Sequence, residues 1–358
     1  MTADFSRILI RATNWVGDAV MCLPALRAIR ERFPDAHVAI LAKPWVADLY
    51  RRETFANEII LYDRSRWTIV RRLRTRRFTC AILLQNAFDA ALIAWLAGIP
   101  HRFGYDRDGR GFLLSRAVAV PKRGEIPRHE RFYYLEMLRR AGITGELLES
   151  PAIQLAGRTQ TERRIIGVSP GAAYGTAKQW LPERFAEAAA RLAGERNAEI
   201  ALFGSGSERE LCEKIAGMLA GRPVTNYAGK TTLAEFIDRA GECELFLTND
   251  SGAMHIASAL GVPTVAIFGA TDDIGTGPTG SHARVVREPV ECSPCLLREC
   301  PIDHRCMTRV TSERVAEEAL KLLEVVRWSV GHTNEDHHAG GVGARDGRPG
   351  GEPRLRTL

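Results

Sequence analysis

Two glycine-containing segments place polar side chains where a short apolar run gives way to a helical pattern. Residues 11–18 (RATNWVGD) end on Asp18, whose carboxylate either caps the following helix or accepts a proton from a substrate hydroxyl. Residues 169–180 (SPGAAYGTAKQW) bring two glycines, a hydroxyl and Lys178 ahead of a helix. Backbone amides, a helix N-terminus and a cation converge there, which suits a phosphate. The alternative is a flexible connection whose lysine faces solvent.

Two further segments carry acids and a histidine. Residues 203–208 (FGSGSE) place Glu208 where it either binds ribose hydroxyls or stabilises a helix N-terminus. Residues 248–255 (TNDSGAMH) bring Asp250 or Ser251 to a helix cap and His255 to the first turn, where a neutral imidazole can donate to a diphosphate. Residues 11–18 are not the GxGxxG dinucleotide fingerprint, which weighs against a dehydrogenase, and residues 169–180 are not a Walker A loop.

Four of the eight cysteines lie within 15 residues, and these are Cys292, Cys295, Cys300 and Cys306. Four thiols so close together are typical of a tetrahedral zinc or iron–sulfur ligand set, with His304 as a further ligand. The spacing departs from paired CxxC motifs, however. A bound metal or cluster, a redox disulfide and free thiols therefore all remain open.

A repeated strand–helix pattern must position these segments. The first cycle predicts strands at 8–10, 38–41, 58–61 and 80–84. It predicts a first helix that ends near residue 32 and further helices at 45–52 and 66–76. Pro24 means that the first helix either starts late or is kinked. The second cycle predicts strands at 165–169, 199–203, 245–248 and 264–268, and helices at 182–195, 207–220, 231–240, 252–260 and 312–328. Such alternation is typical of parallel sheets covered on both faces.

We therefore expect an α/β protein with two Rossmann-like domains that face each other across a cleft. The first domain would span residues 1–155 and the second residues 162–330. Residues 331–358 have almost nothing to bury and are predicted to be a disordered tail. Ligands of open parallel sheets bind at the carboxyl ends of the strands, so the chemistry is expected in the loops that follow the strands.

The charge is concentrated in the first half of the chain. Residues 1–155 carry 25 Lys and Arg against 16 Asp and Glu, whereas the remainder carries 24 against 27. This imbalance favours an anionic partner. The seven arginines between 64 and 77 either belong to the surface that binds this partner or form a solvated helix face. Nucleic acid is not expected, because stacking aromatics are not interleaved with these arginines and no known binding motif occurs. No apolar run is long enough to span a membrane and no secretory signal is expected, so we predict a cytoplasmic protein.

Residues 14–18, 170–180, 203–205 and 248–255 together resemble the ADP-heptose:lipopolysaccharide heptosyltransferases, most closely their heptosyltransferase II branch. The resemblance runs over residues 7–328. It implies a GT-B fold and an inverting, metal-independent transfer of L-glycero-D-manno-heptose from ADP-heptose to the first heptose of the lipopolysaccharide inner core. The alternatives are a GT-B transferase that uses another nucleotide sugar and a non-catalytic sugar-nucleotide-binding module.

The resemblance also assigns residues to roles. Asp18 matches the family's general base and Lys178 its phosphate-binding lysine. The donor-binding residues it implies are Tyr174, Gly175, Thr176, Glu208, Thr231, Asp250, Ser251, Gly252 and His255. It implies no catalytic cofactor and a structural role for the cysteine cluster.

The same resemblance implies an acceptor made of lipid A and inner core, which is rich in phosphate and acidic sugars. The acceptor-side residues predicted from it are Asn14, Arg64, Arg71 and Arg102. It also places the basic first half in peripheral contact with the inner face of the inner membrane.

Overall fold

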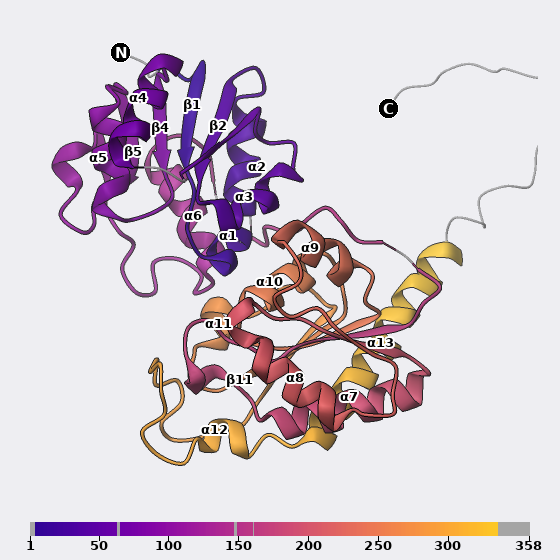
Figure 1. Ribbon diagram of the computed structural model, residues 1–358. Coiled ribbons are helices and arrows are strands. Elements are labelled where there is room, and N and C mark those ends of the chain that lie inside the picture. The colour runs from indigo at the N-terminus through magenta and orange to yellow at the C-terminus, as the bar shows by residue number, and fades with distance from the viewer. Residues whose placement is uncertain (1–3, 63–64, 147–148, 160, 336–358) are drawn as a thin grey trace, which may run out of the picture.

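The N-terminal part of the chain forms a six-stranded parallel sheet. The computed structural model describes residues 4–62, 65–146, 149–159 and 161–335 (Figure 1). The order in the sheet is β3-β2-β1-β4-β5-β6, the order of a Rossmann fold. Its strands are β1 (Arg7–Arg11), β2 (His37–Ala42), β3 (Glu58–Leu61), β4 (Cys80–Leu83), β5 (His101–Tyr105) and β6 (Arg116–Val118).

A second parallel sheet repeats this order in the C-terminal part, as β12-β11-β10-β7-β8-β9. Strands β7, β10 and β11 are buried throughout, which explains their continuous apolar sequences. The strands are β7 (Ile165–Ser169), β8 (Glu199–Leu202), β9 (Val224–Asn226), β10 (Leu245–Asn249), β11 (Thr264–Phe268) and β12 (Ala283–Arg287). The prediction of two Rossmann-like units is confirmed.

Helices cover both faces of the first sheet. The predicted first helix is two helices, which meet at Cys22, and Pro24 lies in the first turn of the second. Proline is tolerated there because the first amides of a helix have no intrahelical partner. The elements are α1 (Val16–Met21), α2 (Leu23–Arg32), α3 (Pro44–Arg51), α4 (Arg66–Arg76), α5 (Phe88–Leu96), the 3₁₀ turn η1 (Gly111–Leu113) and α6 (Glu130–Arg140).

The second sheet is covered in the same way, and the long helix α13 packs on α7 (Figure 1). This last helix was predicted to end near residue 328 but continues to Glu335, so the first residues of the predicted tail are helical. The rest of that tail, 336–358, lies outside the described residues. The elements are η2 (Thr176–Lys178), α7 (Pro182–Arg196), η3 (Gly206–Glu208), α8 (Arg209–Met218), α9 (Leu233–Gly241), α10 (Gly252–Ala259), α11 (Asp273–Thr276), α12 (Arg305–Thr308) and α13 (Ser312–Glu335).

The two units meet through four helices, two from each unit. Helix α1 packs on α10 and α3 packs on α9, and the hydrophobic core runs through this contact from Val20 to Ile256. Ion pairs flank it on two sides, with Arg52 Nη2 2.6 Å from Asp238 Oδ1 and Arg128 Nη2 2.7 Å from Asp272 Oδ2. Among the described residues, no helix has the length and apolar character required to cross a bilayer.

Candidate active site

Two adjoining hollows lie where the strands of the second sheet end against helix α1. The inner hollow, of about 290 Å³, is lined by Phe203, Glu208, Thr231 and Phe236 among others. The cleft hollow, of about 490 Å³, is lined from both domains and includes Asp18, Lys178 and His255. The residues common to both linings are Val16, Ala173, Ser251 and Gly252.

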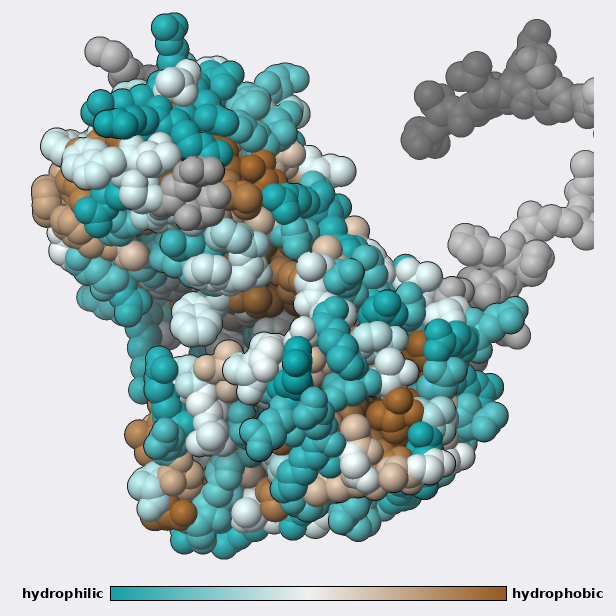
Figure 2. Space-filling model, viewed as in Figure 1, coloured by the Kyte–Doolittle hydropathy of each residue, from teal (hydrophilic) through white to brown (hydrophobic). Residues whose placement is uncertain are grey.

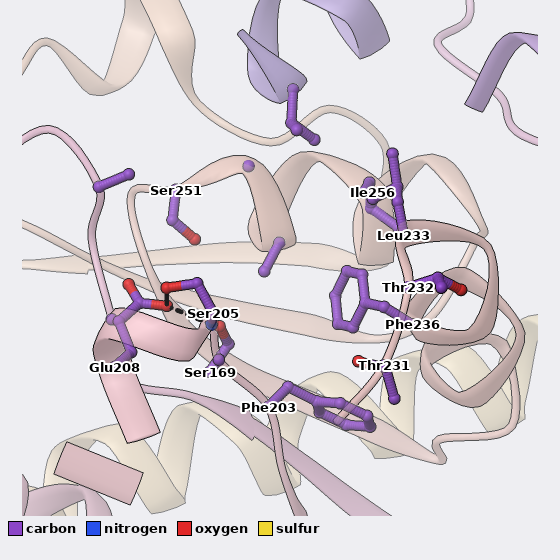
Figure 3. Close-up of a pocket in the computed structure, with 16 residues that line it drawn as sticks. Ser169, Phe203, Ser205, Glu208, Thr231, Thr232, Leu233, Phe236, Ser251 and Ile256 are labelled. Atoms are coloured by element: carbon purple, nitrogen blue, oxygen red, sulfur yellow. Dashed lines mark hydrogen bonds between the residues drawn. The ribbon is translucent and has the colours of Figure 1, made fainter. Parts of the chain in front are cut away.

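The inner hollow has an apolar end and a polar end. In Figure 3, Phe236, Leu233 and Ile256 lie toward one end, while Ser251, Ser205 and Glu208 lie at the other. Phe203 at its floor is held by the ring of Phe236, with centroids 5.3 Å apart. A flat, mostly apolar group with a polar attachment fits such a site.

Glu208 is fixed at the polar end of the inner hollow. Its Oε2 accepts hydrogen bonds from the backbone N–H of Ser205 at 2.7 Å and from the Ser205 hydroxyl at 2.9 Å, which closes a capping box on η3 (Figure 3). Its other oxygen, Oε1, lies against Gly171, where a Cβ would collide with it. The capping interpretation of Glu208 is therefore borne out by the geometry, and the residue also lines the hollow.

Asp18 lies in the first turn of α1 and does not cap it. The helix begins at Val16, so the N-cap is Trp15, and the capping alternative for Asp18 is wrong. The carboxylate Oδ1 instead accepts a hydrogen bond from the hydroxyl of Tyr134 on α6 at 3.1 Å. Burial raises the pKa of Asp18, and the Tyr134 hydrogen bond and the charge of Lys178 oppose that rise. The result is a carboxylate poised as a proton acceptor in the cleft hollow.

Lys178 enters the same hollow from the second domain, and the flexible alternative for it is wrong. Its side chain is 13% exposed, and Nζ donates to Asp250 Oδ2 at 2.5 Å. That oxygen also accepts a hydrogen bond from the hydroxyl of Thr271 at 2.6 Å. The Asp250 carboxylate, which is 4% exposed, therefore has polar partners inside the protein. The ring of Tyr174 lies 4.8 Å from Nζ. A cation held this way is in place before any ligand arrives.

The N-terminus of α10 points at the wall shared by the hollows. Ser251 occupies the N-cap position, yet neither its side chain nor that of Asp250 makes a capping hydrogen bond to this helix. His255 lies one turn further and is 6% exposed, and burial lowers its pKa to about 4. The imidazole is therefore neutral at physiological pH. A helix N-terminus beside a lysine and a neutral imidazole is suited to bind an anion.

Comparisons with known proteins bear on this arrangement. Residues 66–305 match the model of glycosyltransferase family 9 (heptosyltransferase). The chain belongs to this family. It is 31% identical over 343 residues to lipopolysaccharide heptosyltransferase 2 of Escherichia coli, covering 88% of this chain and 98% of that protein. It is 30% identical over 326 residues to lipooligosaccharide heptosyltransferase 2 of Campylobacter jejuni, covering 88% of this chain and 99% of that one.

The solved structures agree with the fold of this glycosyltransferase. The structure of E. coli ADP-heptose lps heptosyltransferase II superposes with a TM-score of 0.76 at 30% identity, covering 90% of this chain and 99% of that chain. The predicted α/β architecture of two Rossmann-like domains in the GT-B arrangement is confirmed. The predicted resemblance to the heptosyltransferase family is confirmed as well.

The glycosyltransferase does not bring every predicted residue to the hollows. Gly175 and Thr176 line neither of them, and the N–H of Gly175 donates to the carbonyl of Ala172 at 3.3 Å. Gly175 packs instead against the backbone of Arg298, with no room for a Cβ. The backbone of this turn is thus used within the protein.

The predicted acceptor-side residues also lie outside both linings. The side-chain oxygen of Asn14 accepts a hydrogen bond from Arg11 Nη2 at 3.1 Å, and its backbone carbonyl accepts one from Trp45 Nε1 at 2.8 Å. Arg102 is occupied by the carbonyls of Ile99, Pro100 and Leu113, so its guanidinium has a structural role. Arg71 is exposed on α4, and Arg64 lies outside the described residues.

Three residues of the site were missed by the sequence analysis. Tyr134 belongs to α6, which was not predicted at all. Arg298 lines the cleft hollow and lies 5.1 Å from the ring of Tyr174; its position between two of the clustered cysteines was the available signal. Asn249 is fully buried and ties the loop after β7 to β10, because it accepts the N–H of Trp180 at 3.0 Å and donates to Pro170 at 2.6 Å.

The four clustered cysteines line one small pocket together with His304. None of these four described cysteines forms a disulfide in the structure, and among the described residues no group of three or more His, Cys, Asp or Glu side chains is arranged to hold a metal ion. The His304 ring nitrogen Nε2 lies 2.9 Å from the carbonyl of Ala177, next to Lys178. The cysteine loop therefore packs directly against the turn that carries Lys178.

Proposed function

We propose that this glycosyltransferase moves L-glycero-D-manno-heptose from ADP-heptose to the first heptose of the lipopolysaccharide inner core. The observation that carries the proposal is the convergence of Asp18 from one domain with Lys178 and His255 from the other in a single hollow. The names of the relatives, lipopolysaccharide and lipooligosaccharide heptosyltransferase 2, support the choice of sugar and acceptor.

The donor is proposed to span both hollows. Its adenine fits against Phe203 and Phe236 at the apolar end of the inner hollow, beside Thr231, and its ribose hydroxyls reach the carboxylate of Glu208. The diphosphate then crosses at Ser251 and Gly252, where the N-terminus of α10 and Lys178 supply positive charge. The heptose is thereby placed in the cleft hollow near Asp18.

We propose a single displacement with inversion. Asp18 accepts the proton of the acceptor hydroxyl while that oxygen forms a bond to the anomeric carbon. The bond from this carbon to the diphosphate oxygen breaks on the opposite face, and ADP leaves with the bonding electron pair. Lys178 stabilises the charge that develops on ADP, helped by a hydrogen bond from neutral His255. The chemistry needs no catalytic cofactor.

The enzyme is proposed to act in the cytoplasm, peripherally on the inner face of the inner membrane, because its acceptor is anchored there by lipid A. The net charge of +9 in residues 1–155 supports contact with that anionic surface.

We propose a bracing role for the cysteine loop. It contacts the Lys178 turn three times: the N–H of Ala177 donates to the carbonyl of Arg298 at 2.9 Å, His304 contacts the carbonyl of Ala177, and the Tyr174 hydroxyl donates to the carbonyl of Leu296 at 2.9 Å. A structural metal, a disulfide and free thiols each remain compatible with bracing. Metal analysis of untagged protein purified without oxygen, followed by thiol counting, separates them.

The decisive experiment is mass spectrometry of acceptor lipopolysaccharide from a strain that lacks the second heptose, after incubation with ADP-heptose and the protein. We expect a mass increase of one heptose, and none with Asp18→Asn. Product formed from UDP- or GDP-sugars but not from ADP-heptose would instead indicate another GT-B transferase. Normal binding of ADP-heptose without any product would indicate a non-catalytic binding module.

A further inference from the structure

Exposed aromatic side chains follow the first four strands of the N-terminal sheet. Trp15 precedes α1, Trp45 and Trp67 lie in the first turns of α3 and α4, and Phe88 begins α5. They are 59%, 57%, 61% and 41% exposed, in that order. Phe112 of η1 is 76% exposed, with its ring centroid 6.1 Å from that of Phe88. We call these five residues the aromatic rim.

The topology places the strand-following members of the rim in a row. Parallel strands have their carboxyl ends at one edge of the sheet, and the strands concerned are neighbours in the order β3-β2-β1-β4. At roughly 4.8 Å per neighbouring strand, the row is about 14 Å long at its base. Single exposed aromatics are ordinary on a protein surface, but a row of them along one edge indicates an interaction surface.

Cations accompany these aromatic side chains. Lys43 Nζ lies 5.7 Å from the ring of Trp45, and Arg66 precedes Trp67 in the first turn of α4. Asp89, an acid beside the rim, is neutralised by Arg66, with Nε 2.5 Å from Oδ1. One turn further along α4, Arg71 is exposed on the same face as Trp67. The rim thus combines large amphipathic rings with positive charge.

We propose that the aromatic rim docks the enzyme on the headgroup layer of an anionic bilayer. The inference rests on the proposed function, in which the acceptor is anchored in a membrane. Tryptophan is enriched at the membrane–water interface, and each nearby Lys or Arg adds attraction to anionic lipids. An acceptor sugar is a weaker match for the rim, because Trp15 is its only member among the described residues that line the two hollows.

The position of the rim also explains how a lipid-anchored acceptor would reach the site. The rim and Asp18 lie at the same edge of the N-terminal sheet, since both follow the carboxyl ends of its strands. In Figure 2 the gap between the two domains opens on the side where α5 lies in Figure 1. Docking by this edge therefore turns the cleft hollow toward the membrane.

The test compares a rim variant with a matched control in the full-length protein. The rim variant carries Trp67→Ala, Phe88→Ala and Phe112→Ala. The control is Trp95→Ala, which removes a tryptophan that is 50% exposed in the last turn of α5, at the opposite sheet edge. Binding is measured by co-sedimentation with vesicles of phosphatidylethanolamine and phosphatidylglycerol, and transfer is measured with vesicle-embedded and with deacylated acceptor.

We expect the rim variant to bind vesicles at least about tenfold more weakly than the wild type, because three large side chains no longer leave water at the interface. Transfer to embedded acceptor should fall in parallel, while transfer to deacylated acceptor and stabilisation by ADP stay within about twofold. Trp95→Ala should behave as the wild type.

Four outcomes would overturn the proposal. Unchanged vesicle binding by the rim variant would exclude the rim as the docking surface, and an equal loss with Trp95→Ala would place docking on the flank of α4 and α5. An equal loss with deacylated acceptor would make the rim a sugar site, and conversion of a dimer into a monomer would make it a contact between two copies. If the wild type transferred no heptose to either acceptor but still bound vesicles through the rim, only the proposed function would fail.

Discussion

Gly17 of α1 and His255 of α10 lie in direct contact across the domain boundary, so closely that a Cβ on Gly17 would lie 2.9 Å from His255 Cδ2. Gly252 has the same relation to Val16, since its Cβ would lie 2.9 Å from that of Val16. Two glycines, one from each domain, therefore set how near the proposed base Asp18 and the proposed phosphate-binding groups come to each other.

Gly17→Ala should lower transfer without unfolding the protein. The added methyl group forces either the His255 ring or the whole of α1 to shift, and misplacing reacting groups by a fraction of an ångström costs roughly ten- to a hundredfold in kcat/KM. Steady-state kinetics measure the effect. Gly217→Ala in α8, where a Cβ meets no neighbour, is the matched control and should be neutral. Equal activity of both variants would refute the close-approach argument.

The pH dependence of transfer should report on Asp18. The base works only when it is deprotonated, so the raised pKa of Asp18 moves the acid limb of the kcat/KM profile upward. Tyr134→Phe removes a hydrogen bond that lowers this pKa, so we expect that limb to move to still higher pH while the rate on the plateau changes little. Asp18→Asn should lose about 10²- to 10⁴-fold in rate and retain ADP binding. An acid limb that does not move in Tyr134→Phe would count against Asp18 as the base.

The pair Lys178–Asp250 allows catalysis and stability to be separated. Lys178→Met leaves the buried Asp250 carboxylate with only the Thr271 hydroxyl, which should lower the free energy of unfolding by about 3 kcal/mol. The double variant Lys178→Met/Asp250→Asn should recover most of that loss, because a neutral amide needs no counter-charge. Urea unfolding measures the stability. Transfer should remain low in both variants; a double variant with restored transfer would show that Lys178 acts only through folding.

Salt should separate the two substrates. Raising the salt from about 50 to about 500 mM shortens the Debye length to about 4 Å, which screens exposed arginines such as Arg71 far more than the part-buried Lys178. We expect the Kd of the acceptor to rise at least about tenfold and that of ADP to change much less. Calorimetric titration measures both constants, and an acceptor Kd that does not respond would show that exposed charge has no part in acceptor binding.

The sequence located correctly those site residues that directly follow a buried strand. Apolar strands and glycine turns are local patterns, so Lys178, Glu208 and the segment around Asp250 were placed in the correct loops. Local patterns misjudged Asp18 as a candidate cap because the helix begins one turn earlier than the aspartate suggests. They also gave no sign of Tyr134, which lies 116 residues from Asp18 and meets it only through the packing of α6 on α1.

The unpredicted strands have a common cause. Strands β6, β9 and β12 lie at or near sheet edges and β5 lies beside the edge strand β6, and each of the four contains polar or charged residues that interrupt its apolar sequence. Hydrophobic periodicity identifies elements that are buried on both sides and fails where burial is incomplete.

The wall that the two hollows share has a consequence for inhibitors. It contains Ala173 and Gly252, which place little side-chain bulk between the two hollows. We expect a single elongated molecule, with a flat ring system at one end and an acidic group at the other, to occupy both hollows. It then loses translational and rotational entropy once, whereas two separate fragments would each lose it. Replacing Ala173 by a bulky residue would block the boundary between the two hollows. The elongated molecule would then bind no more tightly than a fragment that fills one hollow alone.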